Sequence, residues 1–299
     1  MRAARYHSYG APDVLVVEEA PEPHAGPGAV RIEVEATSVN PVDVILRAGG
    51  LHEYFPMTFP AIPGRDAVGV VDEVGPGVTD ARVGDRVFGL GGVSDTTAEY
   101  AVLTAWSPVP DGWTTAQAAA AGLAAATAVP ALAALGDLDG KVLLIEGASG
   151  AVGTAAASLA KAAGATVIGT GSAANQDYLE GLGILHTTYG PGLAARVAAL
   201  APQGVDAGLH AAPSATLPDV VAIVGDPTKV VTVIDEGAPR LGARKINPSN
   251  DSALLHAAAR VGRAGQYTPR VDHEFPFEEI QEAHATAERH SGKVVVHQG

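Results

Sequence analysis

The chain has 299 residues, with 19 Lys and Arg against 33 Asp and Glu, so its formal net charge is −14, and it has no cysteine. An acidic balance gives no electrostatic footprint for nucleic acid or for an anionic membrane. The missing cysteines exclude disulfides, thiolate nucleophiles, iron–sulfur clusters and every zinc site that needs sulfur. No basic and apolar leader opens the chain, and no uninterrupted apolar run reaches the roughly 20 residues of a membrane helix. We therefore expect a cytoplasmic protein that does not contact a membrane.

The first third of the chain has the pattern of a β domain. Residues 31–36 alternate between apolar and charged side chains, as in a strand with one wet face. Residues 68–74 form a second predicted strand, which ends at Gly75-Pro76-Gly77, and the turn at Gly84-Asp85 leads into a third. This region is predicted to be a compact β domain.

The pattern changes after the Pro-rich segment 106–113. An Ala-rich helix is predicted over 115–135, and apolar strands then alternate with helices: strand 141–146, helix 152–163, strand 165–170, helix 175–182, and strands 205–210 and 229–234. Strands that are apolar on both faces and alternate with helices indicate a parallel sheet covered on both sides. Beyond Gly265, a strand at 270–275, a helix at 277–290 and a strand at 293–297 return to the first pattern, and we expect them to rejoin the β domain.

A glycine-rich turn joins the apolar strand 141–146 to the following helix. It reads Gly147-Ala148-Ser149-Gly150-Ala151-Val152-Gly153. Glycines with this spacing allow a tight turn, close approach of the backbone to a pyrophosphate, and close packing of helix on strand. Because a strand precedes the turn and a helix and a second strand follow it, the motif predicts dinucleotide binding.

The end of the second strand, 165–170, indicates which dinucleotide binds. A site for NAD places Asp or Glu there to hold the ribose 2′-hydroxyl. Here Gly171-Ser172 follows, and the first carboxylate is Asp177. Ser172 and Asn175 can donate hydrogen bonds to a 2′-phosphate, so we predict NADP(H), although the loop contains no Arg or Lys.

Other catalytic motifs are absent from the sequence. There is no Tyr-x-x-x-Lys of short-chain dehydrogenases, no Gly-x-Ser-x-Gly elbow and no phosphate-binding P-loop. The ten histidines have no metal-ligand spacing, so no metal ligands are predicted.

In their order along the chain, several short motifs resemble the medium-chain dehydrogenase/reductase superfamily, in particular its zinc-independent quinone oxidoreductase branch. They are Ser38-Val39-Asn40-Pro41-Val42-Asp43, Ile62-Pro63-Gly64-Arg65-Asp66, Gly84-Asp85-Arg86-Val87, Ala98-Glu99-Tyr100-Ala101, Ala125-Ala126-Thr127-Ala128 and Ser291-Gly292-Lys293-Val294-Val295. The resemblance implies an α/β protein with a GroES-like β substrate domain (1–115 and 266–299). It also implies a Rossmann domain with a doubly wound parallel sheet (116–265), and a homodimer.

The same resemblance implies chemistry without a metal. Arg65 stands where zinc-dependent relatives carry a ligand histidine, and the chain has no cysteine to serve as a second ligand. Without a Lewis acid, alcohol oxidation loses its means of forming an alkoxide. The expected activity is therefore transfer of hydride from NADPH to the conjugated C=C of an enone, or to a quinone.

Catalytic and cofactor-binding residues follow from the resemblance. Asn40, Asp43 and Tyr54 are the catalytic candidates, although Asn40 and Asp43 equally suit the N-cap and third position of a helix over 42–47. Arg47 suits either an anionic substrate or a helix end. The residues expected to bind cofactor are Thr127, Gly147, Ser149, Gly150, Ala151, Val152, Gly153, Gly171, Ser172, Asn175, Tyr189 and Ile234.

Two alternatives to a general enone or quinone reductase stay open. One is an enoyl reductase that acts on a single substrate within a biosynthetic pathway. The other is a nucleotide-binding protein without catalysis, because four residues separate Arg47-Ala48-Gly49 from Tyr54, which departs from the spacing of the resembled branch.

Overall fold

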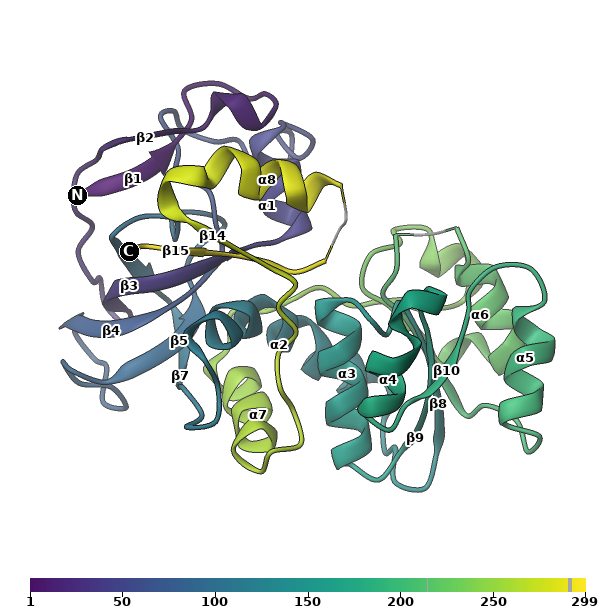
Figure 1. Cartoon of the computed structure of the whole chain (residues 1–299). Coiled ribbons are helices and arrows are strands. Elements are labelled where there is room, and N and C mark those ends of the chain that lie inside the picture. Colours follow the sequence, from purple (N-terminus) through teal and green to yellow (C-terminus); the bar gives the residue numbers. More distant parts are fainter. Residues whose placement is uncertain (214, 290–291) are drawn as a thin grey trace. The chain divides into compact units, whose positions relative to one another are not determined.

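The computed structural model describes residues 1–213, 215–289 and 292–299, and Figure 1 shows the course of the chain. Two compact units emerge from the contacts between residues. The first contains Met1–Leu123, Asn250–Arg263 and Thr268–Gly299, and the second contains Ala124–Ser249 and Ala264–Tyr267. Each unit is built on a sheet of its own.

The first unit contains a seven-stranded sheet in the order β14-β15-β3-β4-β5-β7, with β6 paired to β3. All its pairs are antiparallel except β14 with β15. The strands are β3 (Val30–Val39), β4 (Asp66–Val74), β5 (Arg86–Leu90), β6 (Tyr100–Leu103), β7 (Ala105–Pro108), β14 (His273–Pro276) and β15 (Val294–His297). A separate antiparallel pair joins β1 (Arg2–Arg5) to β2 (Val16–Glu19).

The C-terminal segment adds β15 beside β3, with Val294 opposite Val39. Helix α8 (Ile280–Glu288) covers this part of the unit, and its Ile280 and Ala283 share a buried cluster with Val294 and Val296. A 3₁₀ turn at Phe277–Glu279 precedes α8, so the predicted helix over 277–290 is divided in two. Its last residue, His290, lies outside the described residues, as does Ser291 of the C-terminal motif.

Helix α7 (Ser252–Arg263) belongs to the first unit by its contacts. The backbone N–H of Trp106 donates to Ser252 Oγ at 3.0 Å, and a Cβ at Gly262 would lie 2.5 Å from the Trp113 ring. Contacts therefore place α7 with the β strands, whereas the predicted domain limits put 116–265 in the nucleotide domain. The first change of unit falls after Leu123, inside the long helix α2, and not at 115/116.

Helix α2 (Thr115–Leu135) continues through Pro130 and is the one helix among the described residues that is long and apolar enough to cross a membrane. Of its most apolar window, 78% is buried inside the structure, and core helices of soluble proteins meet the same criteria of length and composition.

The second unit contains six parallel strands in the order β10-β9-β8-β11-β12-β13. This is the doubly wound order of a dinucleotide-binding sheet, so the predicted fold class is confirmed. Figure 1 shows α3 and α4 on one side of the strands and α5 and α6 on the other. The strands are β8 (Val142–Glu146), β9 (Thr166–Thr170), β10 (Leu185–Thr187), β11 (Ala207–His210), β12 (Val230–Thr232) and β13 (Arg244–Lys245). The helices are α3 (Ala151–Ala162), α4 (Gln176–Gly181), α5 (Leu193–Leu200) and α6 (Leu217–Val224).

Strand β8 lies at the centre of this sheet because its side chains are apolar on both faces. Leu143, Leu144 and Ile145 are all fully buried. Leu144 packs in one cluster with Ile168 and Val230 of the same sheet and Leu217 of α6. The core thus holds the end of β8, where the glycine-rich turn begins, in a fixed position.

We expect Leu144→Ala to destabilise the protein by about 2–5 kcal/mol, because it removes buried methyl groups and leaves a cavity. A shift of the urea midpoint of the Rossmann unit measures this effect. Leu185→Ala, at a side chain on β10 that is 40% exposed, is the matched control and should change the midpoint little. Equal shifts for the two variants would contradict the assignment of Leu144 to the core.

Candidate functional site

The glycine-rich turn has the geometry that its sequence predicts. Gly147 follows β8 with φ +81°, a conformation that residues with a Cβ rarely adopt. A Cβ at Gly153 would lie 2.1 Å from the Gly147 carbonyl oxygen, so only glycine allows α3 to pack this closely on the turn. Both positions therefore require glycine.

The start of helix α3 is open where a phosphate would approach. Gly150 is the N-cap of α3, and a Cβ there would meet nothing closer than the Gly147 carbonyl oxygen at 3.5 Å. The helix then runs through the predicted residues Ala151 and Val152. Free backbone N–H groups and the positive end of the helix dipole favour an anion here. These residues fit the pyrophosphate of a dinucleotide.

A group of small polar side chains lies beside this turn, after β9. Asn175 Nδ2 donates to Ser149 Oγ at 3.3 Å and to Ser172 Oγ at 3.1 Å. A Cβ at Gly171 would lie 3.5 Å from Ser149 Oγ and from Asn175 Cβ. The structure therefore brings together Ser149, Gly171, Ser172 and Asn175, which the sequence placed in one site from separate segments.

Two further predicted residues follow strands at the same edge. Tyr189 comes two residues after β10 and is 59% exposed, and Ile234 comes two residues after β12 and is 43% exposed. In a doubly wound sheet, ligands bind outside the carboxyl ends of the strands, near the point where the strand order reverses. The order places that point between β8 and β11. Thr127 differs, because it lies within α2 and is buried.

The sequence did not identify a polar row beneath this edge. Glu146, His210 and Thr232 are the last residues of three neighbouring strands, and all are buried. His210 Nδ1 lies 2.9 Å from Thr232 Oγ1, and its Nε2 lies 3.8 Å from Glu146 Oε2. The sequence signal that could have identified these three residues is that each is polar and ends an otherwise apolar strand.

The first unit contains a buried polar cluster of five side chains, Ser38, Asn40, Asp43, Asp66 and Lys293, each at most 6% exposed. They come from the end of β3, the start of α1 (Pro41–Arg47), the start of β4 and the residue before β15. Among the predicted catalytic residues, Asn40 and Asp43 are members of this cluster.

The carboxamide of Asn40 joins the charges of the cluster. Its Oδ1 accepts from Lys293 Nζ at 2.6 Å. Its Nδ2 donates to Asp66 Oδ1 at 3.0 Å and to Asp43 Oδ2 at 3.1 Å. The Asn40 backbone N–H donates to Asp43 Oδ2 at 2.7 Å, so the predicted capping of α1 is also present. Both N–H groups of the amide are therefore engaged inside the cluster.

Asp66 and Asp43 differ in how well their oxygens are satisfied. Asp66 also accepts from Ser38 Oγ at 2.5 Å and from the backbone N–H of Leu123 at 3.0 Å. Asp43 Oδ1, by contrast, is buried without a hydrogen-bond partner. Burial, and then the neighbouring charge of Asp66, raise the pKa of Asp43 to about 7, against hydrogen bonds from Asn40.

Lys293 is the cation that faces these two carboxylates. Burial lowers its pKa, while the charges of Asp66 and Asp43 act in the opposite direction. The cluster can therefore hold or release a proton near neutral pH at Asp43. Asp66 and Lys293 lie in the sequence motifs Ile62–Asp66 and Ser291–Val295 without a predicted role, although each is a charge at the border of an apolar strand.

Three other residues that the sequence singled out lie outside this cluster. Tyr54 is in the turn after α1 and is 76% exposed, so it is not brought together with Asn40 and Asp43. Arg47 is fully buried and forms an ion pair with Glu288 of α8, which fastens α1 to α8. Arg65 Nη2 donates to Asn250 Oδ1 at 3.0 Å.

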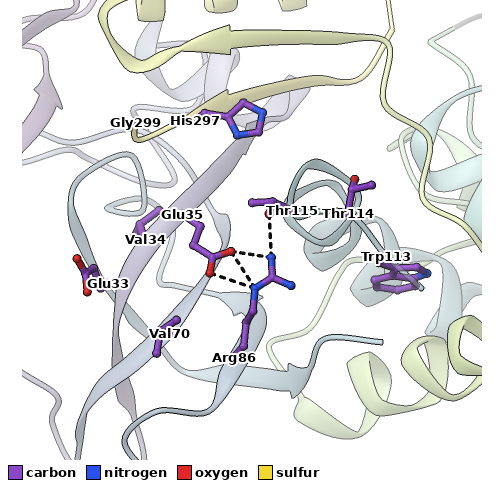
Figure 2. Close-up of a pocket in the computed structure, with 10 residues that line it drawn as sticks. All are labelled: Glu33, Val34, Glu35, Val70, Arg86, Trp113, Thr114, Thr115, His297 and Gly299. Carbon is purple, nitrogen blue, oxygen red and sulfur yellow. Dashed lines mark hydrogen bonds and ion pairs between the residues drawn. The ribbon is translucent and has the colours of Figure 1, made fainter. Parts of the chain in front are cut away.

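A hollow of about 930 Å³ lies elsewhere in the first unit (Figure 2). Arg86 dominates it, with Nη2 donating to Glu35 at 2.6 Å and to Thr115 Oγ1 at 2.9 Å. The hollow shares no residue with the buried polar cluster or with the glycine-rich turn. Its central cation, Arg86, is already paired with Glu35.

We expect the Asp43 carboxyl to make the protein less stable as pH rises. Its pKa is higher in the folded protein, about 7, than its ordinary value of 3.8, so its contribution is full below about pH 4 and is lost as pH rises through 7. The change in urea midpoint between pH 5 and pH 8 measures this loss. Asp43→Asn should show a smaller change, with Asp66 and Lys293 present in both proteins. An equal pH dependence in the two proteins would refute the prediction.

Comparison with known proteins places this geometry in a family. Residues 26–131 match the alcohol dehydrogenase GroES-like domain, and residues 187–296 match the zinc-binding dehydrogenase family. The chain is 38% identical over 178 residues to a quinone oxidoreductase of Rattus norvegicus, covering 57% of this chain and 52% of that protein. It is 42% identical over 168 residues to the pikromycin polyketide synthase component PikAII of Streptomyces venezuelae, covering 55% of this chain and 4% of that protein.

These alignments span about half of the quinone oxidoreductase and a small part of the synthase. Among solved structures, the quinone oxidoreductase from Coxiella burnetii superimposes with a TM-score of 0.86 at 26% identity, covering 100% of this chain and 99% of that one. Fold, domain matches and relatives agree, and the chain belongs to the medium-chain dehydrogenase/reductase superfamily, on its quinone oxidoreductase-like branch.

Proposed function

We propose that this protein is an NADPH-dependent oxidoreductase that reduces the conjugated C=C of an enone, or a quinone, without a metal. One observation carries the proposal: the glycine-rich turn and the Ser149, Ser172 and Asn175 side chains meet at the carboxyl edge of a doubly wound sheet. Oxidoreductase relatives support the reaction class and a nicotinamide cofactor.

The 2′-phosphate is the basis for proposing NADPH over NADH. The loop after β9 offers the hydroxyl of Ser172 and the amide of Asn175, and the glycine-rich turn adds the hydroxyl of Ser149. The loop contains no carboxylate between Gly171 and Gln176. A carboxylate there would accept from a ribose hydroxyl and repel a phosphate. Neutral hydrogen-bond donors can bind the 2′-phosphate without repelling it.

Bound NADPH supplies a hydride, and the reduction of a C=C also requires a proton at the neighbouring carbon. Asp43 is our candidate for exchanging that proton, because its Oδ1 is unpartnered and burial raises its pKa to about 7. Asn40 fixes Asp43 by two hydrogen bonds, and Lys293 fixes Asn40. Tyr54, which is exposed after α1, is the second candidate, with solvent water as the third.

The residue at the position where zinc-dependent relatives carry a ligand histidine supports a reaction without a metal. A guanidinium cannot coordinate zinc, and Arg65 already donates to Asn250. The chain has no cysteine. Within the described residues, no three or more His, Asp or Glu side chains are grouped to hold a metal ion.

The activity is tested by following nicotinamide absorbance with a panel of simple quinones and enones, with NADPH and with NADH. We expect turnover with NADPH that a chelator such as EDTA leaves unchanged. Failure to oxidise either cofactor with every acceptor would reject the oxidoreductase. As corollaries of the family resemblance, we propose a cytoplasmic homodimer, which light scattering of the purified protein and cell fractionation would test.

A pathway-specific enoyl reductase is the second candidate. The match to a polyketide synthase component favours it, at higher identity than the quinone oxidoreductase match. Turnover of an α,β-unsaturated thioester, together with inactivity on simple quinones, would select this candidate. Tight NADPH binding without turnover of any acceptor would instead indicate a nucleotide-binding protein without catalysis.

Gly153→Val should abolish NADPH binding, because a side chain at this position would collide with the Gly147 carbonyl and displace α3 from the turn. Titration of nicotinamide fluorescence measures the loss, which we expect to exceed about 100-fold in Kd. The matched control is Gly181→Ala in α4, where a Cβ would meet nothing within 4 Å. Retained binding in Gly153→Val would remove the turn from the cofactor site.

Ser172→Asp should weaken NADPH binding by about tenfold or more and leave NADH binding equal or stronger, because the new carboxylate repels a 2′-phosphate and accepts from a ribose hydroxyl. Ser172→Asn, which is neutral, serves as its control. Dissociation constants for both cofactors check the prediction. A parallel loss for NADPH and NADH would place Ser172 away from the 2′-position.

A further inference from the structure

One guanidinium organises the loop between β10 and α5. Arg196 donates to four consecutive backbone carbonyls, those of Thr188 at 2.8 Å, Tyr189 at 3.3 Å, Gly190 at 3.3 Å and Pro191 at 2.8 Å. Its Nε also donates to Thr187 Oγ1 at 3.2 Å. The loop therefore wraps around a single side chain that comes from the helix after it.

The backbone of this loop is shaped to accept the guanidinium. Gly190 and Gly192 have φ of +85° and +81°, which allows the intervening carbonyls to turn toward one centre. A Cβ at Gly192 would lie 3.0 Å from Arg196 Nη1, so the close approach also depends on glycine.

The position of this cation is unfavourable for the helix that carries it. Arg196 is the fourth residue of α5, near the end where the helix dipole is positive. The carbonyl oxygens compensate for that repulsion, since the planar fork of arginine places several N–H groups on different acceptors at once. The hydrogen bonds of Arg196 therefore stabilise the preceding loop more than they stabilise α5.

A short path of hydrogen bonds connects Arg196 to the small polar group after β9. Arg196 holds the hydroxyl of Thr187, and the Thr187 carbonyl accepts from the N–H of Gly171 at 3.1 Å. Gly171 borders Ser149 and Asn175. The loop that Arg196 fixes also carries Tyr189, whose side chain is 59% exposed at the carboxyl edge of the sheet.

We propose that Arg196 is a positioning residue for the adenosine half of the nucleotide, acting through the 188–191 loop to hold Tyr189 and the end of β10 in place. The inference rests on the proposed nucleotide-binding function. It assigns Arg196 no contact with the nucleotide, because its donors are engaged by the loop.

The test uses adenosine 2′,5′-bisphosphate, which carries the adenosine and the 2′-phosphate but no nicotinamide. Its Kd is measured by calorimetry for the wild type, Arg196→Gln and Arg196→Lys, with Kd for NADPH measured by fluorescence. We expect both substitutions to weaken both ligands by about tenfold, since lysine keeps the charge but lacks the fork. Arg240→Gln, an exposed arginine in the same unit, is the matched control and should bind as the wild type does.

Two further measurements separate positioning from a general loss of stability. Amide hydrogen exchange should become faster at residues 188–192 in Arg196→Gln, while β8 stays protected. Combining Arg196→Gln with Tyr189→Ala should weaken binding no more than the larger single effect, because both changes remove the same interaction.

Several results would overturn the inference: unchanged affinity in Arg196→Gln, full affinity in Arg196→Lys, unchanged exchange in the loop, or effects that add in the double variant. The failure of the underlying function has a different signature. In that case the wild-type protein itself would bind neither NADPH nor adenosine 2′,5′-bisphosphate.

Discussion

The first unit is organised around a cluster of charged side chains that are buried away from water. Burying an ammonium and two carboxylates is costly unless each is paired and hydrogen-bonded, and the amide of Asn40 is the group that connects them. Through these contacts, Lys293 before β15 is tied to the β3–α1 junction and to Asp66 at the start of β4. The C-terminal strand is consequently part of the unit that contains the candidate catalytic groups, although 253 residues separate Lys293 from Asn40.

In the second unit, the topology of the parallel sheet determines where the candidate cofactor site lies. Parallel strands end at one edge, so turns far apart in the sequence meet there. Gly147, Gly171 and Tyr189 follow three adjacent strands, β8, β9 and β10, and hydrogen bonds through Thr187 and Asn175 connect the three turns. A site for an elongated dinucleotide needs this alignment, because its phosphates and its adenosine must be met by different loops at the same time.

Local sequence patterns predicted the turns and helix starts that depend only on residues close together in the chain. The glycine spacing predicted the turn before α3, and Asn40, Pro41 and Asp43 predicted the start of α1. Contacts between residues far apart in the chain could not be predicted from local sequence patterns. Nothing local to Lys293 indicates that its ammonium meets Asn40, and nothing in Trp106 indicates that it anchors α7. Asn40 lies at the start of α1, as its capping interpretation predicts, and its carboxamide also joins the buried charges, while its catalytic role stays a prediction.

The acidic composition shapes how this chain can bind an anionic cofactor. Two of its cations, Arg196 and Lys293, point their donors at carbonyl and amide oxygens of the protein itself. The groups that stand at the proposed phosphate positions are backbone N–H groups at the start of α3, two serine hydroxyls and the Asn175 amide. Such donors carry no net charge, so their contribution depends on direction and distance and is screened little by salt. The proposed recognition of the phosphates therefore depends on the placement of these loops, to which the hydrogen bonds of Arg196 and the close approach at the glycines contribute.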